Sequence, residues 1–448
     1  MAFITDKQTL ADLNLMGKYK IGSMFNLFNR VKTRGGELLL EEMFRAPLVD
    51  AMAINQRSAR IEYLGRLGVK LEINGELTEM ASEYLTQPRP ANPLSSLFNC
   101  YKEKTQEVLY RSQKYAIQQR HIFAVQEVLL AASNLLGQLE KQGQGEHPCK
   151  AIQDRVSAII NAPGLKQLKP KYPYTVQQMA QCQFLMLNRY RRELEELLRL
   201  LYELDVYLSV GQVAVDKGLV YAQAVDVGSG QTNDWIEVVN LKHPALADAV
   251  GNTITLSRQE NVVFLTGANM AGKSTWMKTL GISFYLAHMG FPVAAERMRF
   301  AVMEGLFTSI NVPDDISQGW SHFYAEVMRV KLVAKEVSSG KRLFVLFDEL
   351  FKGTNVKDAY DATLAVTQKL AKYHTCAFVI STHIIEVGDA LHGTANIQFR
   401  YMPTVMEGAV PRYTYRMASG ITTDRQGMII IENEGILEML GRPVSDHS

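Results

Sequence analysis

Hydrophobic positions in the first half of the chain recur at the spacing of amphipathic helices. Two seams advance in steps of three and four, and they consist of Ile122, Val125, Leu129, Ala132, Leu136 and Leu139, and of Leu187, Tyr190, Leu194, Leu197, Leu201, Leu204 and Leu208. This period predicts helices that each bury one face. The seams favour packing within the chain's own bundle, and a dimerising or DNA-straddling lever is the alternative.

Two segments rich in glycine, proline and polar residues interrupt the helical pattern, at 141–150 and 161–175. Prolines and glycines end helices because they remove a hydrogen bond or favour turn conformations. The second segment ends at Thr175, a residue type that caps helix N-termini. We therefore predict one long helix that begins after Thr175 and carries the second seam.

Downstream the pattern changes to short apolar runs that alternate with helical stretches. The runs are rich in branched and aromatic residues and occupy 262–266, 343–347 and 376–380. They predict buried parallel strands and an α/β nucleotide-binding domain. We expect an all-α core or lever domain over 1–215, a boundary at 216–240 where glycine and polar residues gather, and the α/β domain over 241–448.

Composition agrees with a folded, soluble protein. The chain has 448 residues, which suggests two or three domains of roughly 100–200 residues each. Hydrophobic residues make up 47% and charged residues 21%, which excludes wholesale disorder. Because the net charge is only +2, no strong global field attracts nucleic acid or membrane, so any DNA contact must be local.

The cysteines point to a reducing compartment. They lack metal-ligand or CxxC spacing and are Cys100, Cys149, Cys182 and Cys376. The N-terminus lacks the basic-then-apolar order of a signal peptide, and no apolar run approaches the roughly 20 residues that span a membrane. We expect a cytoplasmic protein that makes no membrane contact.

A glycine-rich segment carries the strongest chemical signal. Residues 267–275, GANMAGKST, match G-x-x-x-x-G-K-[ST] between a predicted strand and a predicted helix. Glycines allow backbone N–H groups to turn towards phosphates at the positive end of the helix. Lys273 is expected to reach the β- and γ-phosphates of ATP and Ser274 to bind Mg²⁺. The predicted ATP-binding residues of this loop are Gly267, Ala268, Asn269, Met270, Ala271, Gly272, Lys273, Ser274 and Thr275.

Two more strand ends bear candidate catalytic groups. Asp348 and Glu349 follow the run at 343–347, so we predict that Asp348 binds the metal and Glu349 acts as the general base. A lone acidic pair would ordinarily be a solvated loop, but the preceding buried strand argues against that. His383 follows the third strand and is expected to sense or polarise the γ-phosphate; by itself it would be a structural histidine. In the segment 311–330, Ser321 before a helix can bind phosphate, although alone this segment is just a loop.

Together these segments resemble the MutS family of mismatch-repair ATPases, relatives of the ABC-type ATPases. GANMAGKST is similar to the family's G-P-N-M-G-G-K-S-T, DDISQGWSHFYAEV to D-D-[LI]-x-x-G-x-S-T-F-x-x-E, DELFKGTN to D-E-[IL]-G-R-G-T-S, and STH to A-T-H. LKHPAL and GNTITL resemble the family's R-H-P and N-[DP]-[IL]-x-L lead-in, and residues 12–64 resemble the start of its helical core. The resemblance covers nearly the whole chain.

The resemblance implies a P-loop ATPase domain of the ABC type whose C-terminal helices support a homodimer with composite sites. Asn269 would help position the γ-phosphate, while Ser321 and Phe323 would complete the partner's site. ATP hydrolysis to ADP would switch states of engagement with duplex, mismatched or branched DNA. Other repair proteins would be further partners, and the protein would associate with the nucleoid.

Several positions depart from the family pattern. Ala249 and Val250 stand where the family has an aromatic and an aliphatic residue against adenine, and we expect Val250 to contact the base. Phe351 replaces a glycine and Lys352 an arginine, whose bidentate fork a lysine cannot form. The chain starts at the helical core, so we expect no mismatch-reading domain and a reduced or absent DNA clamp.

Two functions follow from these patterns. The first is a MutS-like, DNA-associated ATPase in repair or recombination control. The second is an ATP-gated protein-interaction module that does not bind DNA; an ABC transporter subunit is disfavoured because no LSGGQ-type sequence accompanies Ser321. Local DNA contacts would come from Arg189, Arg191 and Arg192 or from Lys166, Lys169 and Lys171, although nearby glutamates also fit a solvated face.

Overall fold

The structure is a computed structural model that divides into two compact units. It describes residues 2–17, 22–143, 145–166, 168, 172–227, 234–268, 270–310, 322–407, 410–422 and 435–440. A helical unit comprises 25–45 and 56–218, and an α/β unit comprises 1–24, 46–55 and 219–448. The chain therefore passes between the units several times, whereas the sequence predicted a single crossing.

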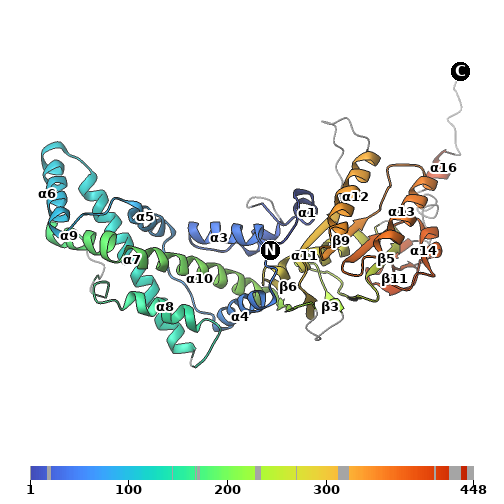
Figure 1. Cartoon of the computed structure of the whole chain (residues 1–448), viewed down its shortest axis with the longest axis horizontal. Coiled ribbons are helices and arrows are strands. Elements are labelled where there is room, and N and C mark those ends of the chain that lie inside the picture. Colours follow the sequence, from blue (N-terminus) through green and yellow to red (C-terminus); the bar gives the residue numbers. More distant parts are fainter. Residues whose placement is uncertain are drawn as a thin grey trace, which may run out of the picture. The chain divides into compact units, whose positions relative to one another are not determined.

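The helical unit is built around the long helices α7 and α10 (Figure 1). Its elements are α3 (Arg34–Arg45), α5 (Gly75–Thr86), α6 (Pro93–Tyr110), α7 (Lys114–Gln142), α8 (Lys150–Ile160), α9 (Val176–Phe184), the π-helical turn η1 (Leu185–Arg189) and α10 (Arg191–Lys217). Two further helices, α2 (Met24–Phe28) and α4 (Ala51–Leu67), run from one unit into the other.

Both predicted seams form the core of this unit. Every residue of the first seam is buried on α7. All of the second except the half-buried Leu208 are buried on η1, on α10 or, for Tyr190, at the residue between them. The helix α7 packs against α5, α6 and α8, while α10 packs against α3, α5 and α8. Within this unit the seams therefore serve intramolecular packing.

Helix α7 is more apolar than we predicted from the sequence. Among the described helices it alone has the length and composition that could cross a membrane. However, 61% of its most apolar stretch is buried inside the unit, as is usual for the core helix of a bundle.

The predicted helix after Thr175 begins where expected but is interrupted. The Thr175 side chain accepts a hydrogen bond from the Gln178 N–H at 3.3 Å, and the Gln178 side chain accepts one from the Thr175 N–H at 3.1 Å. The Tyr190 N–H then donates to the Leu185 carbonyl, five residues back, at 2.8 Å. This wider turn aligns the Tyr190 ring with Gly164, where a Cβ would come within 2.5 Å of it. The prediction of one continuous helix was wrong at this turn.

A close helix crossing depends on two glycines. A Cβ on Gly65 of α4 would lie 2.9 Å from the Gly211 carbonyl oxygen, and a Cβ on Gly211 of α10 would lie 2.8 Å from the Ile61 carbonyl oxygen. The neighbouring atoms are backbone, which cannot rotate away. The two helices can therefore approach this closely only without side chains at these positions.

A six-stranded sheet with strand order β14-β11-β5-β10-β9-β8 forms the centre of the α/β unit. Its strands are β5 (Val262–Gly267), β8 (Gly305–Ser309), β9 (Leu343–Asp348), β10 (Ala377–Ser381), β11 (Ile397–Met402) and the antiparallel edge strand β14 (Ala418–Ser419). The pairs β11/β5, β5/β10, β10/β9 and β9/β8 are parallel. The three predicted strands are thus confirmed as buried and parallel, with β10 between β5 and β9.

Helices cover both faces of this sheet. On one face Phe264, Phe347 and Ile380 share a core with residues of α12, α13 and α14. On the other face Phe344 packs against Phe284 of α11, with ring centroids 4.8 Å apart. The helices of the unit are α1 (Lys7–Asp12), α11 (Lys273–His288), α12 (His322–Ser338), α13 (Val356–Leu370), α14 (Ile385–Leu391) and α16 (Ile436–Leu440).

Smaller sheets surround this core. The order β2-β7-β3-β4 describes a four-stranded sheet, and β1/β6 and β12/β13 are two-stranded. Their bounds are β1 (Val220–Tyr221), β2 (Gln223–Val225), β3 (Asp234–Leu241), β4 (Asn252–Ser257), β6 (Pro292–Val293), β7 (Arg297–Ala301), β12 (Thr404–Glu407) and β13 (Val410–Tyr413). The predicted boundary at 216–240 therefore contributes strands to the α/β unit, because β1, β2 and β3 pair with later strands.

The first residues of the chain belong to the α/β unit and not to the helical domain predicted over 1–215. Ile4 forms a parallel bridge with Gly305 at the edge of β8. The Asp12 carboxylate accepts hydrogen bonds from the Thr308 hydroxyl at 2.7 Å and the Ile310 N–H at 2.9 Å. Backbone pairing with a distant strand explains why local sequence alone assigned this segment to the wrong domain.

We predict that Gly211→Ala destabilises the protein by about 1–3 kcal/mol, because the added methyl group forces α4 and α10 apart. Gly137→Ala is the matched control, since Gly137 also lies inside a helix but a Cβ there meets nothing within 4 Å. Replacing that glycine should stabilise by about 0.5–1 kcal/mol. Chemical denaturation of the full chain followed by circular dichroism measures both; similar midpoint shifts for the two variants would contradict the prediction.

Candidate functional site

The glycine-rich segment joins the fully buried strand β5 to the start of α11. Gly267 (φ 144°) ends the strand and Gly272 (φ 100°) immediately precedes Lys273, the first residue of the helix. Met270 also has a positive φ, 71°. Asn269 lies outside the described residues. This turn directs the N-terminus of a 16-residue helix, with its unpaired N–H groups, at the space beside the loop.

Both glycines are also required by their neighbours. A Cβ on Gly272 would lie 3.0 Å from Cδ1 of Tyr415, and one on Gly267 would lie 3.1 Å from the Met402 carbonyl oxygen. In addition, left-handed φ values are costly for residues that carry a Cβ. The left-handed backbone and the close neighbouring atoms therefore both require glycine at positions 267 and 272.

Lys273 lies beneath the loop and is only 5% exposed. Its ammonium group donates hydrogen bonds to the carbonyls of Gly267 at 2.8 Å and Ala268 at 3.0 Å. Burial lowers the pKa of Lys273, and the nearby carboxylates of Glu349 and Asp348 oppose that shift. Because an ammonium has three protons, a third remains that can be donated to an anion at the loop.

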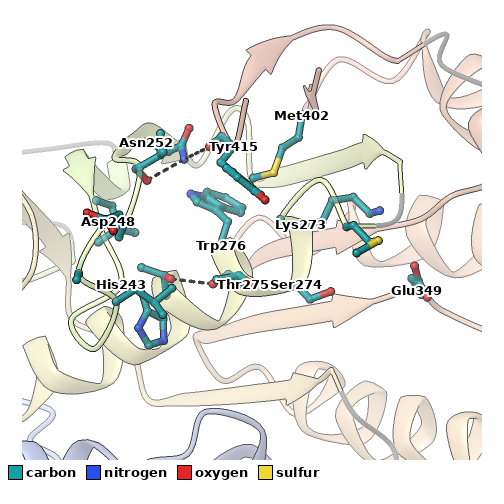
Figure 2. A pocket seen from close by; sticks show the side chains of 18 residues that line it. His243, Asp248, Asn252, Lys273, Ser274, Thr275, Trp276, Glu349, Met402 and Tyr415 are labelled. Carbon is teal, nitrogen blue, oxygen red and sulfur yellow. Dashed lines mark hydrogen bonds between the residues drawn. The ribbon is translucent and has the colours of Figure 1, made fainter. Parts of the chain in front are cut away.

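The acidic pair follows β9 and is held by the end of β10. The Ser381 hydroxyl donates to Asp348, and the Glu349 N–H donates to the carbonyl and hydroxyl oxygens of Ser381 at 3.1 and 3.2 Å. Glu349 has a φ of 53°, so the chain turns sharply after the strand. This turn places Glu349 on the wall of the same pocket as Lys273 and Ser274 (Figure 2).

The pocket beside the loop has a volume of about 850 Å³. It brings together several of the predicted site residues, which are Val250, Met270, Gly272, Lys273, Ser274, Thr275 and Glu349, and it is also lined by Ala249. Other predicted residues lie near it in the chain but do not line it: Gly267, Ala268, Ala271 and Asp348. A space of this size can hold a nucleotide-sized ligand.

Two other candidates lie apart from the pocket. His383 follows β10, but its side chain is exposed and does not line the pocket. Phe323 on α12 packs within its own chain, with its ring centroid 6.1 Å from that of Phe351. Ser321 lies outside the described residues. Phe351 is buried with a φ of 61°, a strained conformation for a bulky residue.

The opposite wall contains residues that are not among the predicted site residues. They are His243, Asp248, Asn252, Trp276, Met402 and Tyr415 (Figure 2). Asn252 holds the wall together, since its side chain donates to the Tyr415 carbonyl at 3.0 Å and accepts from the Met417 N–H at 2.7 Å. The LKHPAL and GNTITL segments contained a signal for His243 and Asn252. No local pattern marked Met402 or Tyr415.

These features define an α/β protein in which a helix N-terminus, a buried lysine and a glutamate share one pocket. Two family models match the chain: MutS domain III over residues 8–211 and MutS domain V over residues 263–440. Together these matches span most of the chain, including both units. The chain therefore belongs to the MutS family.

Curated relatives agree with this assignment. Proteins named DNA mismatch repair protein MutS are similar to the chain in Petrotoga mobilis (27% identity over 263 residues, 57% of this chain and 31% of the relative), Clostridioides difficile (29% over 203 residues, 44% and 21%) and Persephonella marina (26% over 241 residues, 53% and 27%). The matched segment thus spans less than a third of the length of each of these relatives.

Proposed function

We propose that the chain binds ATP in the pocket beside residues 267–275 and hydrolyses it to ADP. The observation that carries this proposal is the convergence of the buried Lys273, the N-terminus of α11 and Glu349 on one 850 Å³ pocket. A helix N-terminus and a lysine stabilise phosphate charge, and a carboxylate beside them can accept a proton from water.

Lys273 and the loop would bind the phosphates. The N–H groups at the start of α11 would donate to phosphate oxygens, and the Lys273 ammonium would balance charge that develops on the γ-phosphate. Asn269 would position that phosphate. Because Lys273 is already anchored on two carbonyls, its ammonium needs little reorganisation to face the phosphates.

Glu349 would orient the attacking water and accept its proton. Ser381 fixes the backbone of Glu349, which supports a constant position for the carboxylate. His383 would sense the γ-phosphate from the end of the neighbouring strand. Its exposed position requires either a side-chain rearrangement or a ligand that reaches beyond the pocket.

The donor set also fits Mg²⁺. The Ser274 hydroxyl lines the pocket, and the half-buried Asp348 accepts from Ser381 through one carboxylate oxygen, which leaves the other to bind a metal shell. Magnesium usually takes only one or two protein oxygens together with phosphates and water. It would neutralise phosphate charge. The described residues contain no group of three or more His, Cys, Asp or Glu side chains that could form a protein-only cage.

We expect Lys273→Ala to weaken ATP binding at least about tenfold, and Glu349→Gln to preserve binding while lowering turnover by roughly 10²–10⁴-fold. The first variant loses charge at the phosphates, whereas the second keeps its shape and loses only the base. Calorimetric titration and phosphate release measure the two effects. Turnover by Glu349→Gln at the wild-type rate would rule out the general-base role.

We further propose a homodimer with composite sites. This proposal rests on the family resemblance at Ser321 and Phe323, which would complete the ATP site of the partner subunit. If that is correct, mixing Lys273→Ala with Ser321→Ala protein should restore one working site per heterodimer. The expected signal is ATPase activity that rises on mixing above the sum of the two separate variants; an additive result would contradict shared sites.

For the wider function we propose an ATP-dependent, DNA-binding protein of the mismatch-repair type, acting in repair or recombination control. The names of its relatives support this role. Of the basic residues proposed as contacts, Arg191 pairs with Glu195 at 2.9 Å. Lys169 and Lys171 lie outside the described residues. A DNA contact made by Arg191 would therefore require its ion pair with Glu195 to break.

One observation favours the alternative, an ATP-gated protein-interaction module. Apolar side chains are exposed along α6 at helical spacing, which is unusual unless a partner covers them: Leu94, Phe98, Tyr101 and Val108. Such a surface suits a protein partner better than the phosphates of DNA.

A salt titration distinguishes the two functions. Binding to duplex, mismatched and branched DNA should weaken linearly in log affinity with log salt if phosphate contacts dominate. Fluorescence anisotropy with labelled DNA measures this slope, with and without ATP. If none of these DNAs binds or stimulates ATPase activity at low salt, the DNA-binding proposal fails and the interaction module is favoured.

A further inference from the structure

The chain turns sharply twice directly after β9. Glu349 has a φ of 53° and Phe351 a φ of 61°, although both residues carry a side chain. A left-handed φ brings the Cβ of such a residue too close to a backbone carbonyl oxygen, so each turn is unfavourable by itself. Strained conformations of this kind persist only where the surrounding structure holds them. Contacts made by the residues around Glu349 must therefore keep the chain in this shape.

The Phe351 side chain anchors the residues after Glu349 in the core of the α/β unit. It is only 4% exposed and belongs to the apolar cluster that β9 and β10 share with α12, α13 and α14. Its ring lies against that of Phe323 on α12, with 6.1 Å between the centroids and 60° between the ring planes. Burial of a whole aromatic side chain stabilises by an amount of the same order as the cost of a left-handed residue. The ring can therefore hold a turn that the backbone alone disfavours.

Two hydrogen bonds support the same anchor. The hydroxyl of the buried Thr363 on α13 donates to the Leu350 carbonyl at 3.3 Å, and the Gly353 N–H donates to the carboxylate of the buried Glu326 on α12 at 3.4 Å. On the other side of the turn, the end of β10 accepts the N–H of Glu349. The backbone of Glu349 is thus held between β10 on one side and the helices α12 and α13 on the other.

We propose that Phe351 is a positioning residue for Glu349, because its buried ring fixes the turn that places Glu349 on the pocket wall (Figure 2). This inference rests on the proposed ATP hydrolysis with Glu349 as the base. Phe351 does not line the pocket, so it acts through Glu349 and not on the nucleotide. Glycine, which the family pattern has at this position, adopts a left-handed φ freely but has no ring to anchor the turn.

Phe351→Leu tests the anchor, because leucine keeps the Cβ that strains the turn but loses the aromatic ring. We expect kcat for ATP hydrolysis by the full chain to fall at least about fivefold, since small displacements of a catalytic group cost up to about 10²-fold in rate. The Kd for ATP, measured by calorimetry without Mg²⁺ to prevent turnover, should change less than about twofold because Lys273 and its loop are untouched. A smaller fall in kcat, or an equal loss of ATP binding, would overturn the proposal.

Phe378→Leu is the matched control. Phe378 on β10 is buried in the same apolar cluster, but it stands beside Val262 at the start of β5, at the opposite end of these strands from the glycine-rich loop. The same substitution there should lower the denaturation midpoint and leave kcat unchanged. If both variants lower kcat alike, general loss of core packing explains the effect and the proposal fails.

A double variant shows whether Phe351 acts through Glu349. Because Glu349→Gln removes the base, adding Phe351→Leu to it should lower the remaining turnover by less than about twofold. Single-turnover phosphate release measures this residual rate. If the losses of the two single variants multiply in the double variant, Phe351 acts independently of Glu349 and is not its positioning residue.

Circular dichroism establishes that each variant is folded. Should Phe351→Leu fail to fold, Phe351→Met takes its place, since methionine is a flexible side chain that fills core gaps without the planar shape of the ring. Phe378→Met is then the control, and the same changes in kcat and in the Kd for ATP decide the outcome.

The outcomes separate this inference from the function beneath it. ATP hydrolysis that depends on Glu349 but not on Phe351 would overturn only the inference. If the wild-type chain does not hydrolyse ATP, or if Glu349→Gln hydrolyses it at the wild-type rate, the function on which the inference rests fails as well.

Discussion

The parallel pairing of β5, β10 and β9 is the constraint on which the site depends. In this register Ser381, the last residue of β10, stands opposite Leu265 on one side and Asp348 on the other. The glycine-rich loop and the acidic pair therefore emerge at the same edge of the sheet, although their strands are not neighbours. Ser381 then bonds to both acidic residues, which links the spacing of the strands to the geometry of the pocket.

A second pairing supplies the rest of the pocket. The strand β11 lies beside β5 with Met402 opposite Gly267, so a segment more than a hundred residues downstream lies against the loop. The Asn252 side chain then fixes the segment at 415–417 by hydrogen bonds to the backbone of Tyr415 and Met417. Three distant parts of the chain thus share one cavity, and the glycines of the loop have no side chains because these neighbours occupy the space.

Elements with strong local signals were predictable. The three buried strands, the cap at Thr175 and the strand-loop-helix order around Lys273 all follow from residue type and spacing. The failures occurred where distant contacts overrode local pattern. Backbone pairing places Ile4 in the α/β unit and makes strands of the predicted boundary at 216–240. The helix that its apolar period suggested was continuous is interrupted at η1, where the Tyr190 ring lies against Gly164.

The sequence by itself determined the chemistry available at the site: a lysine after a glycine turn, a hydroxyl beside it, and an acidic pair after an apolar strand. These depend on neighbours in the chain, so local order suffices. Only the tertiary structure decided that Glu349 faces the pocket and that His383 does not. Burial and hydrogen-bond pairing depend on which distant groups pack alongside, and no single stretch of sequence contains that information.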